Sequence, residues 1–159
     1  MRTNLIIILL LASVLTACDK KQECPYTATT AVAPPAEVAS LKATLDANAV
    51  TYTQHPSGIF YQIGTPGAGT VPGVCNDVTV KYSGRLISST TPFDQSTSGV
   101  TFALGALITG WQIGIPLIKP GGTITLYIPP SLGYGSAGSG QTIPPNSNLV
   151  FTIELINVQ

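Results

Sequence analysis

The stretch "GWQIGIPLIKPGGTITLYIP", Gly110–Pro129, is the most informative part of the sequence, because it predicts a short helix followed closely by a strand. Trp111 and Ile115 are four positions apart and would share one side of a helix of one or two turns. Pro116 must then lie near the end of this helix, since proline lacks an N–H and clashes inside a helix. After a Pro-Gly-Gly turn, apolar residues alternate in "TITLYI", as they do in a half-buried strand.

The same alternation with a period of two occurs on both sides of this stretch, in "IFYQIG", "DVTVKYSG" and "NLVFTIELINV". The alternating residues expected on the buried side are Ile59, Tyr61, Ile63, Val78, Val80, Tyr82, Ile124, Leu126, Ile128, Leu149, Phe151, Ile153 and Leu155. Gly/Pro turns separate the strands, and no βαβ crossover is indicated. We therefore expect an α+β fold in which an antiparallel β-sheet curls around one short α-helix.

A second helix is predicted before the sheet. In "PAEVASLKATLDANAV", which begins at Pro35, Val38, Leu41 and Leu45 are spaced i, i+3 and i+7 with polar residues between them. This is the pattern of a short amphipathic helix, which we expect at the edge of the domain.

The first residues, "MRTNLIIILLLASVLTAC", read as a signal peptide over 1–17, because the apolar run is too short to span a bilayer. The motif Leu15–Cys18 resembles the lipobox of bacterial lipoproteins. That resemblance implies acylation of Cys18 and anchoring to a membrane of the bacterial cell envelope, on the periplasmic side or at the cell surface. Two or three acyl chains would hold the protein firmly.

Cys24 and Cys75 are the only other cysteines, and the expected compartment is oxidising. A disulfide between them is our hypothesis, and two unpaired thiols remain the alternative. The bond would tie the domain back to a point near the anchor.

Several kinds of chemistry are disfavoured. Between Ser57 and Gln159 three basic residues balance three acidic ones, so there is no basic stripe for nucleic acid. The single histidine, His55, and the dispersed cysteines suggest neither a metal site nor a catalytic triad, and we expect no cofactor.

The glycines in "GYGSAGSG" match the G-x-G-x-x-G dinucleotide fingerprint at Gly133, Gly135 and Gly138. The fingerprint requires a strand that leads into it and a helix that begins from it. Here a double proline precedes the glycines and "TIPP" follows them, so we reject a dinucleotide site.

Five segments, "VKYSG", "PFDQS", "ITGWQIGIPLIKPGG", "IPPSLGYG" and "IPPNSNLVFTIELINV", occur in the order and approximate spacing of the FKBP-type peptidyl-prolyl cis-trans isomerases. The chain resembles this family from Ser57 to Gln159. The resemblance implies a curled sheet around a short helix with an apolar cleft between them. It also implies an isomerase that assists the folding of exported proteins. Its substrates would be unfolded or nascent polypeptides with X–Pro bonds, and macrolides would be possible inhibitors.

The resemblance also implies roles for individual residues. It makes Tyr82, Asp94, Tyr134 and Phe151 catalytic, and Phe93, Leu107, Ile108, Trp111 and Ile143 substrate-binding. Trp111 would form the floor under a proline ring, and Tyr82 would pair with Asp94. The backbone N–H of Ile108 and the phenol of Tyr134 would hydrogen-bond the ligand.

The expected organisation has four parts: a lipoprotein signal peptide (1–17), a lipid-anchored linker (18–35), an N-terminal helix with a lead-in (36–56) and an isomerase domain (57–159). We expect a monomer. Two other functions remain open, namely a lipoprotein chaperone that holds proline-containing chains without turning them over, and a structural envelope lipoprotein.

Three departures from the family pattern lie around the cleft. The segment from Asp94 to Phe102 contains no arginine, Val100 stands where a large aromatic residue often occurs, and Thr142 replaces an aliphatic residue. They predict a wider, wetter cleft, with weak macrolide binding and reduced catalysis.

Overall fold

The computed structural model describes residues 24–159. The predicted signal peptide and the predicted acylation of Cys18 lie outside the described residues. Within residues 24–159, no helix combines the length and the apolar character needed to cross a bilayer.

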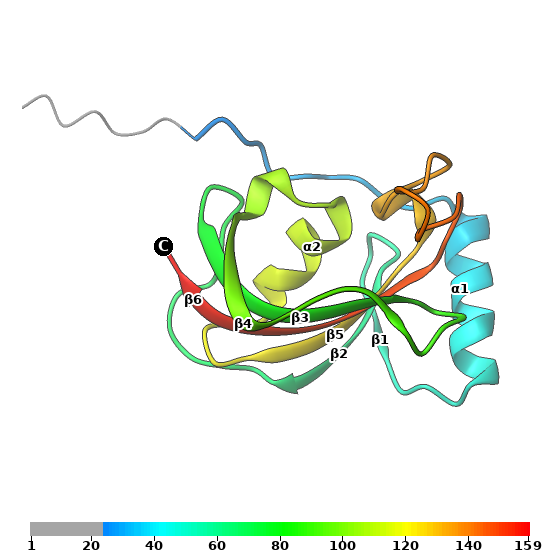
Figure 1. Ribbon diagram of the computed structural model, residues 1–159, viewed down its shortest axis with the longest axis horizontal. Coiled ribbons are helices and arrows are strands. Elements are labelled where there is room, and N and C mark those ends of the chain that lie inside the picture. Colours follow the sequence, from blue (N-terminus) through cyan, green and yellow to red (C-terminus); the bar gives the residue numbers. More distant parts are fainter. Residues whose placement is uncertain (1–23) are drawn as a thin grey trace, which may run out of the picture.

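Six strands form one antiparallel sheet (Figure 1), which confirms the α+β prediction. In chain order they are β1 (Thr53–Gln54), β2 (Phe60–Thr65), β3 (Asp77–Leu86), β4 (Pro92–Ala103), β5 (Thr123–Ile128) and β6 (Leu149–Val158). Their order in the sheet is β1-β2-β5-β6-β3-β4, so the strand that comes last in the sequence lies inside the sheet. The sheet begins at Thr53, inside the segment expected to lead into the domain.

Helix α2 (Thr109–Gly114) and the 3-10 helix η2 (Ile115–Leu117) lie on the concave side of this sheet (Figure 1). Gly110 and Gly114 face β5. A Cβ atom at Gly110 would lie 2.6 Å from Ile128 Cδ1, and one at Gly114 would lie 2.6 Å from Leu126 Cδ2. The missing side chains thus allow the helix backbone to approach the strand closely.

Helix α1 (Pro35–Ala47) covers the opposite side of the sheet at one end. Its buried residues, Leu41 and Leu45, pack against Phe60, Tyr127 and Val150, which are neighbours on β2, β5 and β6. The helix was expected at the edge of the domain, but these contacts place it over the outer face.

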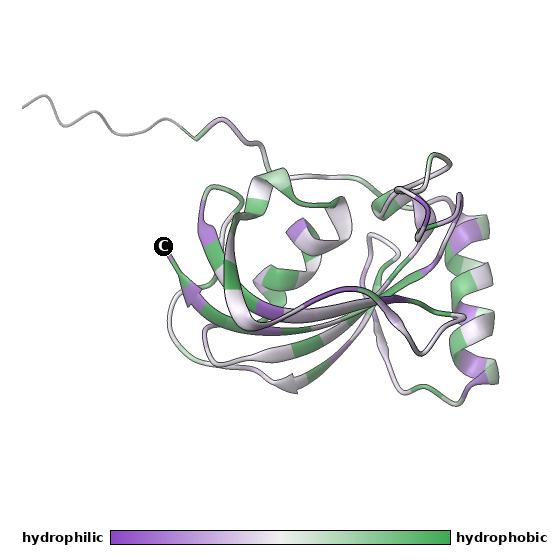
Figure 2. Ribbon diagram, in the orientation of Figure 1, coloured by the Kyte–Doolittle hydropathy of each residue, from purple (hydrophilic) through white to green (hydrophobic). Residues whose placement is uncertain are grey.

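In β2, the burial of two residues differs from the sequence prediction. Phe60 is fully buried beneath α1, whereas Ile63, expected on the buried side, is 39% exposed. The prediction for Ile63 was wrong because β1 pairs with β2 only at Phe60 and Tyr61, so Ile63 lies on an unpaired edge of the sheet, whereas its neighbour Ile124 on β5 is 1% exposed. Along β3 and β6 hydrophobic and hydrophilic residues alternate (Figure 2).

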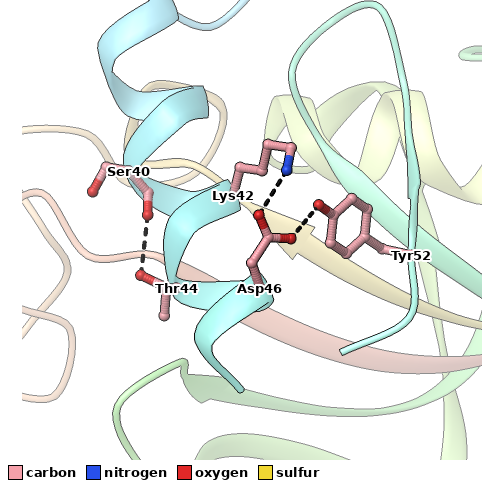
Figure 3. A network of polar contacts seen from close by, with 5 residues as sticks. All are labelled: Ser40, Lys42, Thr44, Asp46 and Tyr52. Carbon is pink, nitrogen blue, oxygen red and sulfur yellow. Dashed lines mark hydrogen bonds and ion pairs between the residues drawn. The ribbon is translucent and has the colours of Figure 1, made fainter. Parts of the chain in front are cut away.

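A polar network fixes the end of α1 to the loop before β1 (Figure 3). The Asp46 carboxylate accepts hydrogen bonds from Lys42 Nζ and from the Tyr52 hydroxyl, each at 2.6 Å. The hydroxyl of Thr44 donates to the Ser40 carbonyl at 3.0 Å. The hydrogen bonds from Lys42 and Tyr52 lower the pKa of Asp46, and the Asp46 carboxylate raises the pKa of Lys42 to about 12.

Residues 24–34, here called the strap, lie against the domain before α1 begins. A disulfide joins Cys24 to Cys75, with their Cα atoms 5.5 Å apart. At the other end of the strap, the buried Ala33 donates its N–H to the Ser57 carbonyl at 2.8 Å. The strap is therefore fastened to the domain near both of its ends.

Candidate active site

Three aromatic rings surround the buried indole of Trp111 in α2, on the concave side of the sheet. The ring centroid of Trp111 lies 5.3 Å from that of Tyr82 on β3 and 5.2 Å from that of Phe151 on β6. Phe102 on β4 contacts it at 6.4 Å. All three contacts are edge-to-face, the arrangement that aromatic quadrupoles favour, so the rings hold one another in fixed orientations.

These rings border a cleft with a volume of about 330 Å³, which is at the small end of the range for ligand sites. Its lining residues are Tyr82, Asp94, Phe102, Ala106, Leu107, Ile108, Trp111, Tyr134 and Phe151. Most of these side chains are apolar, and Asp94 is the only carboxylate among them. Such a cleft suits an apolar group that is oriented by a few polar contacts.

The polar wall of the cleft is a pair formed by Tyr82 and Asp94. The two residues lie on the adjacent strands β3 and β4, and the Tyr82 hydroxyl donates to Asp94 Oδ2 at 2.7 Å. Burial, reinforced by the hydrogen bond to Asp94, raises the pKa of Tyr82 to about 12. The phenol therefore remains protonated at neutral pH and acts as a donor.

Two further donors at the cleft have no acceptor within residues 24–159. The N–H of Ile108, just before α2, makes no hydrogen bond, and neither does the half-buried Tyr134 hydroxyl, which follows the 3-10 helix η3 (Pro130–Leu132). Burial, and to a smaller extent the charge of Asp94, raises the pKa of Tyr134. Both groups are free to bind an acceptor, such as a carbonyl oxygen, in the cleft.

One lip of the cleft is the segment that joins β4 to α2. It contains the 3-10 helix η1 (Leu104–Ala106) and ends at Ile108. From α2, Gln112 Nε2 donates to two carbonyls of this segment, Gly105 at 3.2 Å and Leu107 at 2.8 Å. We call residues 104–108 the lip below.

Seven of the nine cleft residues expected from the sequence line the cleft, and two do not. Phe93 packs edge-to-face on Phe151, with ring centroids 5.7 Å apart. Ile143 is 5% exposed and belongs to the main core. Both residues support the wall of the cleft from behind. The packing of Phe93 on Phe151 needs the glycine at position 84, because a Cβ atom there would lie 2.9 Å from Phe151 Cδ1 and 3.0 Å from Phe93 Cε2.

Phe102 and Ala106 line the cleft and were missed by the sequence reading. Phe102 could have been found, because it lies two positions after Val100 in "VTF" and so faces the same side of β4. Its ring contributes aromatic surface to the wall in addition to the rings that were expected. Val100 itself pairs with Val80 and does not line the cleft. For Ala106, neither its residue type nor its spacing carries a signal.

Among residues 24–159, no three His, Cys, Asp or Glu side chains cluster in a way that could hold a metal ion. His55 lies away from the cleft. Its Nδ1 accepts the Ser57 N–H at 3.1 Å and lies 2.9 Å from Ser57 Oγ. This arrangement closes a local turn before β2.

Comparison with known proteins supports the geometry. Residues 70–156 match the sequence model described as FKBP-type peptidyl-prolyl cis-trans isomerase. The chain is 44% identical over 105 residues to the probable FKBP-type peptidyl-prolyl cis-trans isomerase FkpA of Neisseria meningitidis serogroup B. This match covers 64% of the chain and 38% of that protein. The chain spans less than half the length of the curated relatives that we compared.

Two solved structures have the same architecture. The crystal structure of FkpA from Escherichia coli superposes with a TM-score of 0.70 at 38% identity, over 78% of this chain and 60% of that one. The structure of a peptidyl-prolyl cis-trans isomerase from Pseudomonas syringae pv. tomato gives 0.69 at 34% identity, over 80% of this chain and 97% of that one.

Proposed function

This chain belongs to the family of FKBP-type peptidyl-prolyl cis-trans isomerases, and on that basis we propose that it catalyses the isomerisation of X–Pro bonds in exported polypeptides. One observation carries the proposal. The aromatic cleft over Trp111 has two hydrogen-bond donors, the Ile108 N–H and the Tyr134 hydroxyl, without acceptors among residues 24–159. A proline ring would lie on the indole, and the adjoining carbonyl would accept from these donors.

The reaction requires no nucleophile, metal or cofactor. Rotation about an X–Pro bond destroys amide resonance and meets a barrier of ~18–20 kcal/mol, so unaided isomerisation takes about 10–100 s. The planar amide is more charge-separated than the twisted one, and an apolar cleft therefore disfavours the ground state relative to the transition state. Fixed donors that hold the carbonyl while it rotates add electrostatic stabilisation.

We assign five side chains directly to this task. Phe151 and Trp111 supply the apolar walls that exclude water from the amide. Tyr134 donates to the substrate carbonyl. Asp94 and Tyr82 act together, because the phenol holds the carboxylate in one orientation against the twisting bond. Leu107 provides apolar contact on the lip, and Phe93 and Ile143 hold the walls in place from behind.

A protease-coupled assay on a short Xaa-Pro peptide tests the proposal. The wild-type protein should accelerate isomerisation, and Phe151→Ala should lower kcat/KM by roughly tenfold or more, equivalent to the loss of about 1.4 kcal/mol of transition-state stabilisation. Thr152→Ala is the matched control, because Thr152 adjoins Phe151 but is exposed on the other face of β6.

If the wild-type protein gave no acceleration, the proposed catalysis would be rejected. If it also slowed the aggregation of an unfolded protein in a manner that Phe151→Ala abolished, it would be a chaperone that holds proline-containing chains.

We propose the bacterial cell envelope as the site of action, with a lipid anchor at Cys18. The support is the Leu15–Cys18 motif, together with the Cys24–Cys75 disulfide, which is typical of an oxidising compartment. Mass spectrometry of the mature N-terminus should find an acylated cysteine, and Cys18→Ala should move the protein from the membrane fraction to the soluble one. A monomer and weak macrolide binding remain predictions.

A further inference from the structure

The strap lies outside the part of the chain that matches the family, yet it borders the same lip that lines the cleft. In Figure 1 the blue strap runs beside the yellow-green residues of η1. Farther along, Ala28 and Thr29 lie across a small pocket from Ile113 and Pro116, on the side of α2 and η2 away from the sheet. The strap thus passes behind the helix whose Trp111 forms the floor of the cleft.

The ring of Tyr26 in the strap lies directly on Gly105 in the lip. A Cβ atom at position 105 would be 2.6 Å from Tyr26 Cδ2, and the three atoms nearest to it would all belong to Tyr26. Gly105 is therefore required for this packing, and its backbone does not have a positive φ that would require glycine.

The disulfide fastens the strap to the start of the same lip. Cys24 is two residues before Tyr26, and its partner Cys75 precedes Asn76, whose carbonyl accepts the N–H of Leu104 at 3.0 Å. The ring of Tyr26 is therefore held between a covalent bond and the segment on which it packs.

The inner side of the lip faces the cleft. Gln112 holds the Gly105 and Leu107 carbonyls from α2, and Tyr26 packs on Gly105 from outside. The next residue after Leu107 is Ile108, whose N–H is one of the two free donors. A lip that moved at Gly105 would carry the Ile108 N–H out of position.

We propose that Tyr26, fastened by the Cys24–Cys75 disulfide, is a positioning residue that holds the lip and thereby aims the Ile108 N–H into the cleft. The expected change in kcat/KM rests on the proposed isomerase function, whereas the expected change in the mobility of the lip does not. It predicts that the strap contributes to activity although it contacts no substrate.

The first test compares Tyr26→Ala, Tyr26→Phe and Gly105→Ala in the purified protein. Tyr26→Ala should lower kcat/KM by about threefold to tenfold, the effect expected when one hydrogen bond loses its alignment. It should also speed hydrogen exchange of the amides in residues 104–108, while those of β6 keep their protection. Tyr26→Phe, which keeps the ring, should behave as wild type, and so should Val32→Ala, a control in an exposed part of the strap.

Gly105→Ala supplies the decisive comparison. In the wild-type background its methyl group must displace the Tyr26 ring, so exchange in the lip should speed up and kcat/KM should fall. In the Tyr26→Gly background the three atoms nearest to this methyl group, including the Tyr26 Cβ at 2.5 Å that alanine would keep, are all removed, and the same substitution should have much less further effect. Equal effects of Gly105→Ala in both backgrounds would overturn the proposal, as would wild-type exchange in Tyr26→Ala.

Reduction of the disulfide tests the fastening. Dithiothreitol supplies two electrons and two protons, which convert the bond to two thiols, and it should reproduce the faster lip exchange of Tyr26→Ala in the wild-type protein. It should add little to Tyr26→Ala itself. Unchanged lip exchange after complete reduction would refute the role of the disulfide. A wild-type protein without isomerase activity would refute the proposed function, while lip exchange would still decide on Tyr26.

Discussion

The Tyr82 hydroxyl donates a 2.7 Å hydrogen bond to Asp94 Oδ2 across β3 and β4, at the polar wall of an otherwise apolar cleft. The bond fixes the orientation of an exposed carboxylate that has no basic partner in the adjoining segment. It also makes the phenol of Tyr82 harder to ionise.

The free energy of unfolding should therefore depend on pH in the alkaline range through Tyr82. Burial and the bond to Asp94 raise its pKa from 10.0 to about 12 in the folded protein. Because the folded value is the higher one, the stabilising contribution is fully present below pH ~10 and is lost as the pH rises through about 12.

Urea denaturation of wild type and Tyr82→Phe at several alkaline pH values measures this contribution. The stability of the wild-type protein should fall more steeply than that of Tyr82→Phe. The variant should retain part of the slope, because the pKa values of Tyr127 and Tyr134 are also raised. Identical slopes for the two proteins would contradict the assignment.

Gly84→Ala should damage both stability and activity. A methyl group at this buried position would press on the rings of Phe93 and Phe151, and overpacking of this kind typically costs about 1–3 kcal/mol. The displaced Phe151 ring should also lower kcat/KM. Ser83→Ala, at the preceding position, is the control in a denaturant titration combined with the peptide assay, and it should change neither quantity appreciably.

Leu45→Ala should separate stability from activity. Leu45 is buried between α1 and the outer face of the sheet, so its truncation should cost about 2–5 kcal/mol of unfolding free energy. The cleft lies on the other face, and kcat/KM per folded molecule should remain at the wild-type value under conditions where the variant is folded. A large fall in kcat/KM would mean that α1 is coupled to the cleft through the sheet.

Asp46→Asn should weaken the network at the end of α1 in a pH-dependent manner. The pKa of Asp46 is lowered by Lys42 and Tyr52, so its stabilising contribution is present above its ordinary value of 3.8 and is lost as the pH falls further. The variant should have a lower Tm than wild type near neutral pH, and the difference should shrink in acid and at high salt. A difference in Tm that did not depend on pH would contradict an ionic origin.

The sequence predicted those helices and strands that bury only one face. The alternation in "NLVFTIELINV" predicted β6, and the spacing of Trp111 and Ile115 predicted α2. The burial of Phe60 could not be predicted, because Phe60 lies within a continuous apolar run. Alternation alone does not show which residue of such a run a second layer will cover.

The cleft residues that could be predicted are those that lie within the ordered motifs shared with the family. Phe102 was missed because the polar run "DQSTSG" follows Phe93 in β4 and the pairing with β3 shifts between Val80 and Tyr82, so only the short stretch from Val100 onward shows the alternation that indicates it. The packing of Tyr26 on Gly105 lay beyond any local pattern. It depends on a contact between positions far apart in the sequence, which only the folded chain brings together.

The position of β6 inside the sheet governs when this protein can fold. Val78 pairs with Val158, and β6 joins β1-β2-β5 to β3-β4, so the earlier strands alone could form only two separate parts of the sheet. Pairings over such sequence separations form slowly, because the loop must close before the contacts stabilise it. The cleft therefore acquires the wall that contains Phe151 only after residues 149–158 have been synthesised.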